Sequence, residues 1–106
     1  MTLSLFITPE ANQNVRKIAR YLEERNVSAA RRFTRAIEQT GKMLLQDPEL
    51  GERLRSDPAG QIRYRTVSGF RNYLIFYRRR DAILEIVRVL HGAMDMDKDD
   101  ETVFQE

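Results

Sequence analysis

Four side chains in the C-terminal half of the chain are of the types that a metal-free ribonuclease uses. Arg63 and Arg65 stand two positions apart, and Arg88 comes shortly before His91, the one histidine of the chain. Such an enzyme needs a base for the 2′-hydroxyl group, an acid for the leaving oxygen and cations for the phosphorane. The other interpretation is that the arginines form a solvated face and that His91 hydrogen-bonds the backbone at a strand end.

The chain contains few residues that could form another kind of catalytic site or a metal site. The chain has no cysteine, which excludes disulfide bonds and thiolate metal sites, and a single histidine leaves too few nitrogen ligands for most others. The acids Asp95, Asp97, Asp99 and Asp100 lack the glycine turn and the terminal glutamate of a calcium-binding loop. We therefore expect no metal and no cofactor.

Charge divides the chain into a basic body and an acidic end. Residues 61–92 carry seven arginines against Asp81 and Glu85, whereas residues 93–106 carry one lysine against six acids. Either the body has an anionic partner or the acidic end neutralises it. The chain has 106 residues, the length of a single domain. We therefore expect one domain over residues 1–92, followed by an acidic tail over residues 93–106. Without a signal peptide or an apolar run of about 20 residues, it is expected to be cytoplasmic, with no membrane contact.

The elements that position these residues centre on residues 72–95. Two apolar runs, 73–77 and 83–90, are rich in β-branched and aromatic residues and are separated by Arg78-Arg79-Arg80-Asp81. Their length and composition predict a β-hairpin. Because both of its faces are apolar, the hairpin is either covered on both sides or covered on one side and left open for a partner.

Two amphipathic helices are predicted before the hairpin, after a short strand at residues 3–7. In the first, Thr8 is the expected N-cap, Pro9 opens the helix and Asn26 ends it in a left-handed conformation. In the second, Ser28 is the expected N-cap and Asp47-Pro48 ends the helix. Each has one apolar stripe at helical spacing, and the two stripes must cover the sheet.

The remaining segments complete a sheet. Residues 47–60 are polar and contain two glycines and two prolines, which predicts a loop. Residues 62–67 alternate as a half-buried strand does, and residues 68–71 turn the chain into the hairpin. The order is strand, two helices and three antiparallel strands, which is an α+β two-layer sandwich.

Two segments resemble a known family. Residues 72–78, N-Y-L-I-F-Y-R, and 85–95, E-I-V-R-V-L-H-G-A-M-D, resemble the last two strands of the ParE toxins, a branch of the RelE/ParE superfamily of bacterial toxin–antitoxin systems. The usual ending is close to R-V-L-H-G-A-R-D, and Met94 replaces its second arginine. The resemblance implies the same sandwich and a non-enzymatic toxin. Such a toxin inhibits DNA gyrase and forms a hetero-oligomer with a cognate ParD-like antitoxin that neutralises it.

The RelE branch supplies an alternative, a ribosome-dependent mRNA endonuclease. RelE-like nucleases often carry an arginine after an S-G-Y turn, which Ser68-Gly69-Phe70-Arg71 resembles, and a tyrosine or histidine near the C-terminus. Aligning the strands by their apolar pattern places Tyr73 at that arginine instead, and no tyrosine follows Gly92. In this alternative His91 would be the base, and the phosphate would lie among Arg63, Arg65, Arg71 and Arg88.

We favour the ParE interpretation, and it implies contacts with an antitoxin. The antitoxin is expected to lay an amphipathic helix and an extended segment across the toxin. The helical hairpin and the sheet edge suit these two modes, helix-in-groove contact and strand addition. The residues predicted to contact partners are Val15, Ile18, Leu22, Tyr73, Arg78, Arg88, His91 and Asp95.

Overall fold

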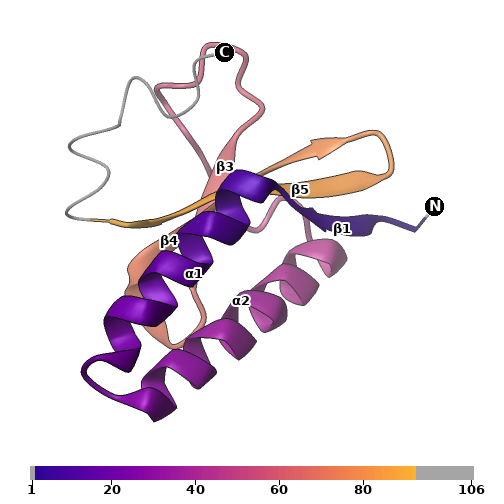
Figure 1. The fold of residues 1–106 in the computed structure, drawn as a ribbon. Helices are drawn as coiled ribbons and strands as arrows, with labels where there is room; N and C mark the ends of the chain where they lie inside the picture. Colours follow the sequence, from indigo (N-terminus) through magenta and orange to yellow (C-terminus); the bar gives the residue numbers. More distant parts are fainter. Residues whose placement is uncertain (1, 93–106) are drawn as a thin grey trace.

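The computed structural model describes residues 2–92, in which two helices cover one face of a five-stranded sheet (Figure 1). The sheet order is β1-β5-β4-β3-β2, with β1 parallel to β5 and all other pairs antiparallel. The predicted α+β two-layer sandwich is confirmed. The predicted acidic tail, including Asp95, lies outside the described residues. The elements are β1 (Ser4–Ile7), α1 (Pro9–Glu23), α2 (Val27–Gln46), β2 (Glu52–Arg53), β3 (Arg63–Val67), β4 (Phe70–Arg80) and β5 (Ile83–His91).

Thr8 joins the first strand to the first helix as predicted. Its side chain accepts a hydrogen bond from the Ala11 backbone N–H at 3.1 Å, which caps α1, and Pro9 is the first helical residue. The same hydroxyl donates to the Val87 carbonyl at 3.2 Å. Thr8 therefore fixes the start of α1 to β5, 79 positions later in the chain.

The turn between the helices differs from the prediction. Asn26 does not end α1 in a left-handed conformation but opens α2, since its backbone is extended and its side chain accepts from the Ala29 N–H at 3.2 Å. Ser28, the predicted N-cap, is instead a helical residue. Both residues can cap a helix, but Asn26 comes first and has the extended backbone that an N-cap needs. The helices are thus joined by residues 24–26.

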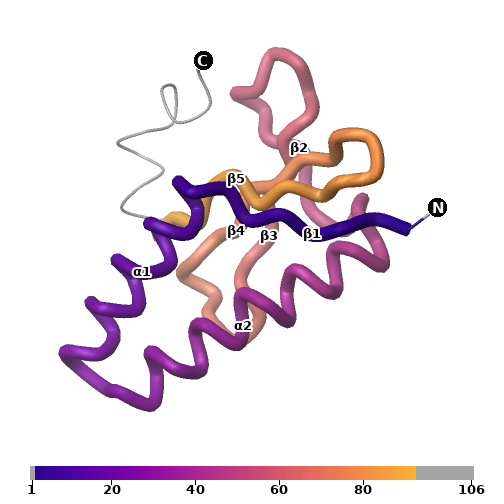
Figure 2. Tube along the Cα trace, turned by 45° about the vertical axis from the view of Figure 1, so that its right-hand side comes forward, coloured from indigo at the N-terminus to yellow at the C-terminus, as the bar shows by residue number. Residues whose placement is uncertain are grey.

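The apolar stripe of α2 packs against the sheet, and its one polar member is satisfied. Thr40 is fully buried, and its hydroxyl donates to the Ala36 carbonyl at 2.7 Å and accepts from the Ser68 N–H at 3.0 Å. The next residue, Gly41, lies so close to β1 that an added Cβ would be 2.7 Å from the Leu5 side chain. The view in Figure 2 shows α2 running beneath β1 and across the sheet.

The β4–β5 hairpin is buried on both faces. The face toward the helices, the helix-side face, holds the larger apolar cluster, and the opposite or outer face holds a smaller one. Strands β4 and β5 lie inside the sheet, flanked by β3 and β1. The helix-side cluster includes Phe33, Ile37, Leu44, Tyr73, Ile75, Tyr77, Leu84, Ile86 and Val89. The outer cluster includes Leu54, Ile62, Phe76 and Leu90, with Tyr64, Leu74 and Val87 against it.

A β-bulge in β5 changes which residues share a face. Phe76 lies opposite Arg88 and Tyr77 lies opposite Ile86, so Val87 has no residue opposite it in β4. One extra residue on a strand shifts its side-chain alternation by one. Val87 packs in the outer cluster, and the shift after it puts Arg88 on the outer face and Val89 and His91 on the helix-side face.

Residues 47–60, predicted as a loop, contain the short edge strand β2 and are held by specific hydrogen bonds. The buried Tyr77 hydroxyl donates to the Pro48 carbonyl and accepts from the Gly51 N–H, both at 2.8 Å. The Asp57 carboxylate accepts from the N–H groups of Gln61 and Ile62 at 2.7 and 2.8 Å. This local folding brings Leu54 and Ile62 onto the outer face. The sequence pattern did not predict β2 because its two residues are both charged.

We expect Tyr77→Phe to lower the free energy of unfolding by about 1–3 kcal/mol, because the buried Gly51 N–H loses its acceptor. Urea denaturation measures the loss. Burial raises the pKa of the Tyr77 hydroxyl, so the folded protein keeps a proton that the unfolded chain releases near pH 10. Wild-type stability should therefore fall as the pH rises above about 10, and Tyr77→Phe should remove this contribution.

The matched control for that substitution is Tyr21→Phe, since Tyr21 is 49% exposed. Its hydroxyl has no hydrogen-bond partner within residues 2–92. The Tyr21→Phe variant should therefore unfold at the same midpoint concentration of urea as the wild-type protein. Equal losses in both variants would contradict the role given to the Tyr77 hydroxyl.

Candidate partner-binding surface

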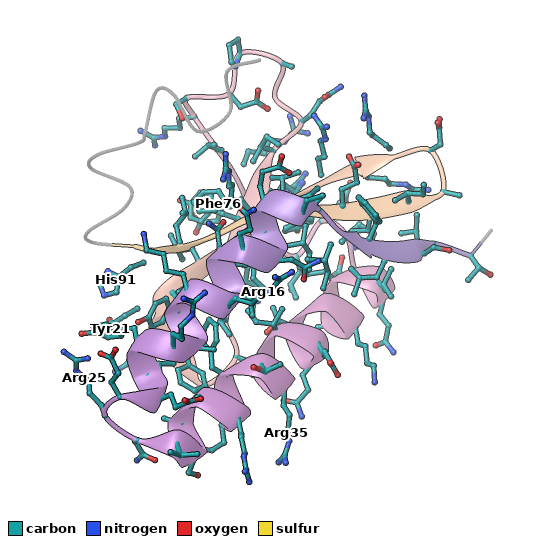
Figure 3. The ribbon with its side chains drawn as sticks, viewed as in Figure 1. Arg16, Tyr21, Arg25, Arg35, Phe76 and His91 are labelled. Carbon is teal, nitrogen blue, oxygen red and sulfur yellow. The ribbon has the colours of Figure 1, made fainter. Side chains whose placement is uncertain are left out.

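His91 lies at the margin of the helix-side cluster. It stands opposite Tyr73 in the β4–β5 register, and the two rings meet edge to face with centroids 5.2 Å apart. Tyr73 is buried and makes a second edge contact, also at 5.2 Å, with Phe33 of α2. His91 is half-buried. The histidine, labelled in Figure 3, thus closes one end of a row of three aromatic rings at the exit of β5.

The sheet separates the arginines that the sequence grouped with His91. Arg63 lies opposite Tyr77 and Arg65 opposite Ile75, so both belong to the helix-side face. Arg88 lies opposite Phe76 and belongs to the outer face. The proposed base and two of the cations therefore share a face. Arg63 and His91 stand opposite β4 residues that are four positions apart, Tyr77 and Tyr73, and Arg88 lies on the other face of the sheet.

Arg63 has a structural contact of its own. Its guanidinium donates to the Gly51 carbonyl at 2.8 Å and to the Glu49 carbonyl at 3.4 Å. These bonds fasten the segment before β2 to β3, beside the hydroxyl of Tyr77. Arg65, two residues further along the same face, has no such bond to the described part of the chain.

The two alignments of the RelE-like arginine point to residues in different environments. Strand β4 begins at Phe70, earlier than predicted, because Gly69 takes a positive φ of 81° and closes a two-residue turn. Arg71 is therefore within the strand, and its side chain is exposed. Tyr73, the other aligned position, is a buried core residue.

The α1 residues predicted to contact partners pack largely inward. Val15, Ile18 and Leu22 are half-buried and lie against the helix-side cluster. Next to them, Asn14 accepts a hydrogen bond from the Val89 N–H at 3.1 Å, which holds α1 along β5. Only the flank of this stripe is open to a partner.

Arg78 and Arg88, the predicted cationic contacts, lie on the outer face. Arg78 pairs with Glu85 at 2.9 Å, and Arg80 approaches the same carboxylate oxygen at 3.9 Å. Arg88 is half-buried beside the outer cluster. The predicted partner residues thus divide between a helix-side group and an outer group.

Two exposed apolar residues that sequence reasoning missed adjoin the outer group. Phe6 of β1 is 48% exposed and Ile83 of β5 is 43% exposed. Phe6 lies beside Glu85 and Ser4 beside Ile83, which places both apolar side chains on the outer face. Strand alternation could have found Phe6, because Leu5 and Ile7 face the helices. We call β1 together with Phe6 and Ile83 the β1 edge surface.

The two edges of the sheet differ in chemistry. Within residues 2–92, β1 pairs only with β5, and residues 2–7 carry no charge. The other edge, β2, consists of Glu52 and Arg53. Charged side chains at an edge discourage pairing with another chain, whereas an uncharged edge permits it.

We expect Arg63→Met to lower the free energy of unfolding by about 1 kcal/mol, because a partly exposed, charge-assisted hydrogen bond to the Gly51 carbonyl is lost. Arg65→Met is the matched control, since it removes the same charge from the same face. Urea denaturation compares the two variants. A cost for Arg65→Met as large as that for Arg63→Met would contradict the anchoring role.

Comparisons with known proteins agree on one family. A family model described as the ParE toxin of the type II toxin–antitoxin system parDE matches residues 5–96. A solved structure entitled "Chromosomal ParDE TA system from P. aeruginosa" superimposes with a TM-score of 0.70. It is 19% identical in sequence over 85% of this chain and 96% of its own, and it therefore supports the fold. A search of curated protein sequences gave no match.

The described residues were also compared with the requirements of a membrane span and of a metal site. Neither α1 nor α2 is long and apolar enough to cross a membrane. Within residues 2–92, no three side chains of the metal-ligating kinds gather at one place.

Proposed function

Because this chain belongs to the ParE toxin family of type II parDE toxin–antitoxin systems, we propose that it is a non-enzymatic toxin that inhibits DNA gyrase. We propose further that a cognate ParD-like antitoxin neutralises it by binding the β1 edge surface. The family supports the gyrase target and the antitoxin. The second proposal rests on the uncharged edge of β1 beside Phe6 and Ile83.

The separation of the arginines supports a binding rather than a catalytic role. A ribonuclease needs its base and its phosphate-binding cations within hydrogen-bond reach of one substrate. Arg88 is on the outer face, Arg63 is bonded to the Gly51 carbonyl, and His91 packs on Tyr73. The contacts of Arg63 and His91 give these two residues structural roles, and the position of Arg88 removes it from their face.

Strand addition at β1 suits an extended antitoxin segment. A strand paired to the free side of β1 would gain main-chain hydrogen bonds, and Phe6 and Ile83 would pack against its apolar side chains. The ion pair of Arg78 and Glu85 lies nearby, so a positive and a negative side chain would stand at the polar rim of that contact. The large exposed apolar side chains of the outer face, Phe6 and Ile83, lie at β1. Their position favours β1 over β2 as the edge that binds the antitoxin.

Purified full-length protein tests the gyrase proposal. Micromolar protein should reduce the supercoiling activity of DNA gyrase and increase its cleavage complexes, and heat-unfolded protein should do neither. Unchanged supercoiling and unchanged cleavage complexes with folded protein would refute the proposal.

Induction in bacteria without antitoxin distinguishes the toxin from a nuclease. We expect double-strand breaks in DNA while messenger RNA stays intact, and we expect His91→Ala to remain toxic if it folds. Rapid cleavage of message with intact DNA, abolished by His91→Ala in a variant with wild-type stability, would instead establish the RelE-like activity.

The double variant Phe6→Ser/Ile83→Ser should bind the antitoxin at least about tenfold more weakly, a loss of about 1.4 kcal/mol, because two apolar anchors are removed. Isothermal titration measures the dissociation constant. The matched control is Val27→Ser, since Val27 is 54% exposed at the far end of the helical hairpin. A double variant that binds as tightly as the control would exclude the β1 edge surface.

A further inference from the structure

The outward surface of the helical hairpin is strongly basic. Residues 9–46 contain eight lysines and arginines against four glutamates. Seven of these cations have exposed side chains on the faces of α1 and α2 that do not contact the sheet. Figure 3 shows Arg35 extending away from α2. We call these seven residues the basic helical surface: Arg16, Lys17, Arg20, Arg31, Arg32, Arg35 and Lys42.

These cations have no structural role among the described residues. Within residues 2–92, none of the seven makes a side-chain hydrogen bond or an ion pair. Other arginines do: Arg63 holds the segment before β2, Arg78 and Arg80 share Glu85, and Arg25 stacks on Tyr21 at 3.9 Å. The basic helical surface is therefore available to an anionic partner.

Helix stability does not account for the charges on α2. The helix dipole favours acids in the first turn and bases in the last, by about 0.3–1 kcal/mol each. Glu38 stands four residues before Lys42, a spacing that favours an ion pair, but the two form none within residues 2–92, and α2 has neither an acid in its first turn nor a base in its last. Its three arginines instead stand in the N-terminal half beyond the first turn, where they gain nothing from the dipole.

The cations follow a line that suits a regular anionic backbone. Arg31, Arg35 and Lys42 are spaced by four and seven residues, which places them along one side of α2 over about 16 Å, with one exposed carboxylate, Glu38, on the same side between Arg35 and Lys42. One strand of a DNA duplex presents about five phosphates over that length. Exposed amide side chains, which commonly bond phosphate oxygens, lie on the same helices: Asn12, Gln13, Gln39 and Gln46.

The composition of this surface favours DNA over an acidic protein segment. Protein interfaces centre on buried apolar or aromatic anchors. Of the large exposed apolar residues of the hairpin, Tyr21 is on α1 and Met43 is on another side of α2, whereas Val27 stands one turn before Arg31 at the end of the line. Protein–DNA interfaces are instead polar and positively charged, and phosphate contacts require no apolar centre.

We propose that the basic helical surface binds the phosphate backbone of duplex DNA without reading its sequence. This contact goes beyond gyrase inhibition and antitoxin binding, and it needs neither partner. It would place the protein on DNA through α1 and α2 while the β1 edge surface stays free.

Fluorescence anisotropy with a labelled 20-base-pair duplex tests the contact, using the full-length protein at 50–200 mM salt. Wild-type protein should bind, with affinity falling steeply as salt rises. Arg31→Gln/Arg35→Gln/Lys42→Gln should bind at least about tenfold more weakly at 50 mM salt. Its logarithmic salt slope should be smaller by about 2–3, since each phosphate contact contributes about 0.9.

The control variant Arg53→Gln/Arg55→Gln/Arg79→Gln removes the same charge from exposed positions outside α1 and α2, and it should keep the wild-type slope. Three results would overturn the proposal: no binding of wild-type protein at 50 mM salt, equal losses in both variants, or binding of polyglutamate where duplex DNA is not bound. Gyrase inhibition that persists in the helix variant would leave the proposed function intact, which separates the two proposals.

Discussion

The β4–β5 hairpin is apolar on both faces, and the rest of the molecule is arranged to keep both faces from water. Helices α1 and α2 cover one face with a broad layer. The other face is covered by Leu54 and Ile62 from the segment after α2. That second cover is small, so its position depends on individual hydrogen bonds: the Tyr77 hydroxyl and Arg63 hold one end, and Asp57 closes the other. Burial supplies the driving force, and these polar contacts determine where the chain lies.

Much of this arrangement follows from patterns that act over a few residues. The apolar stripes of the helices, the Thr8 cap and the two strands of the hairpin are local features, and each was predicted from spacing and residue type. The choice between Asn26 and Ser28 was wrong because both residues can cap a helix, and the backbone conformation decides. Strand β2 was missed since pairing with β3, rather than its own composition, makes it a strand.

The candidate site was less predictable because face assignment depends on a single residue. Strict alternation along β5 would place Arg88 with Leu84 and Ile86, and His91 on the opposite face. The bulge at Val87 reverses this relation, so His91 joins Tyr73 on the helix side and Arg88 joins Phe76 on the outer side. Nothing in the run from Ile83 to His91 marks the extra residue. Arginines also look alike in a sequence, whereas in the fold one holds a loop, one pairs with Glu85 and others point into solvent.

The parallel pairing of β1 with β5 has a consequence for how the protein is made. The first strand leaves the ribosome early, but Thr8 and its acceptor at Val87 are separated by 79 positions. At typical rates of synthesis, of about 5–20 residues per second, β1 waits several seconds for its neighbour. During that interval its uncharged, apolar segment has no sheet to join. The edge of the finished sheet, and any surface built upon it, therefore comes into existence only after β5 has been synthesised.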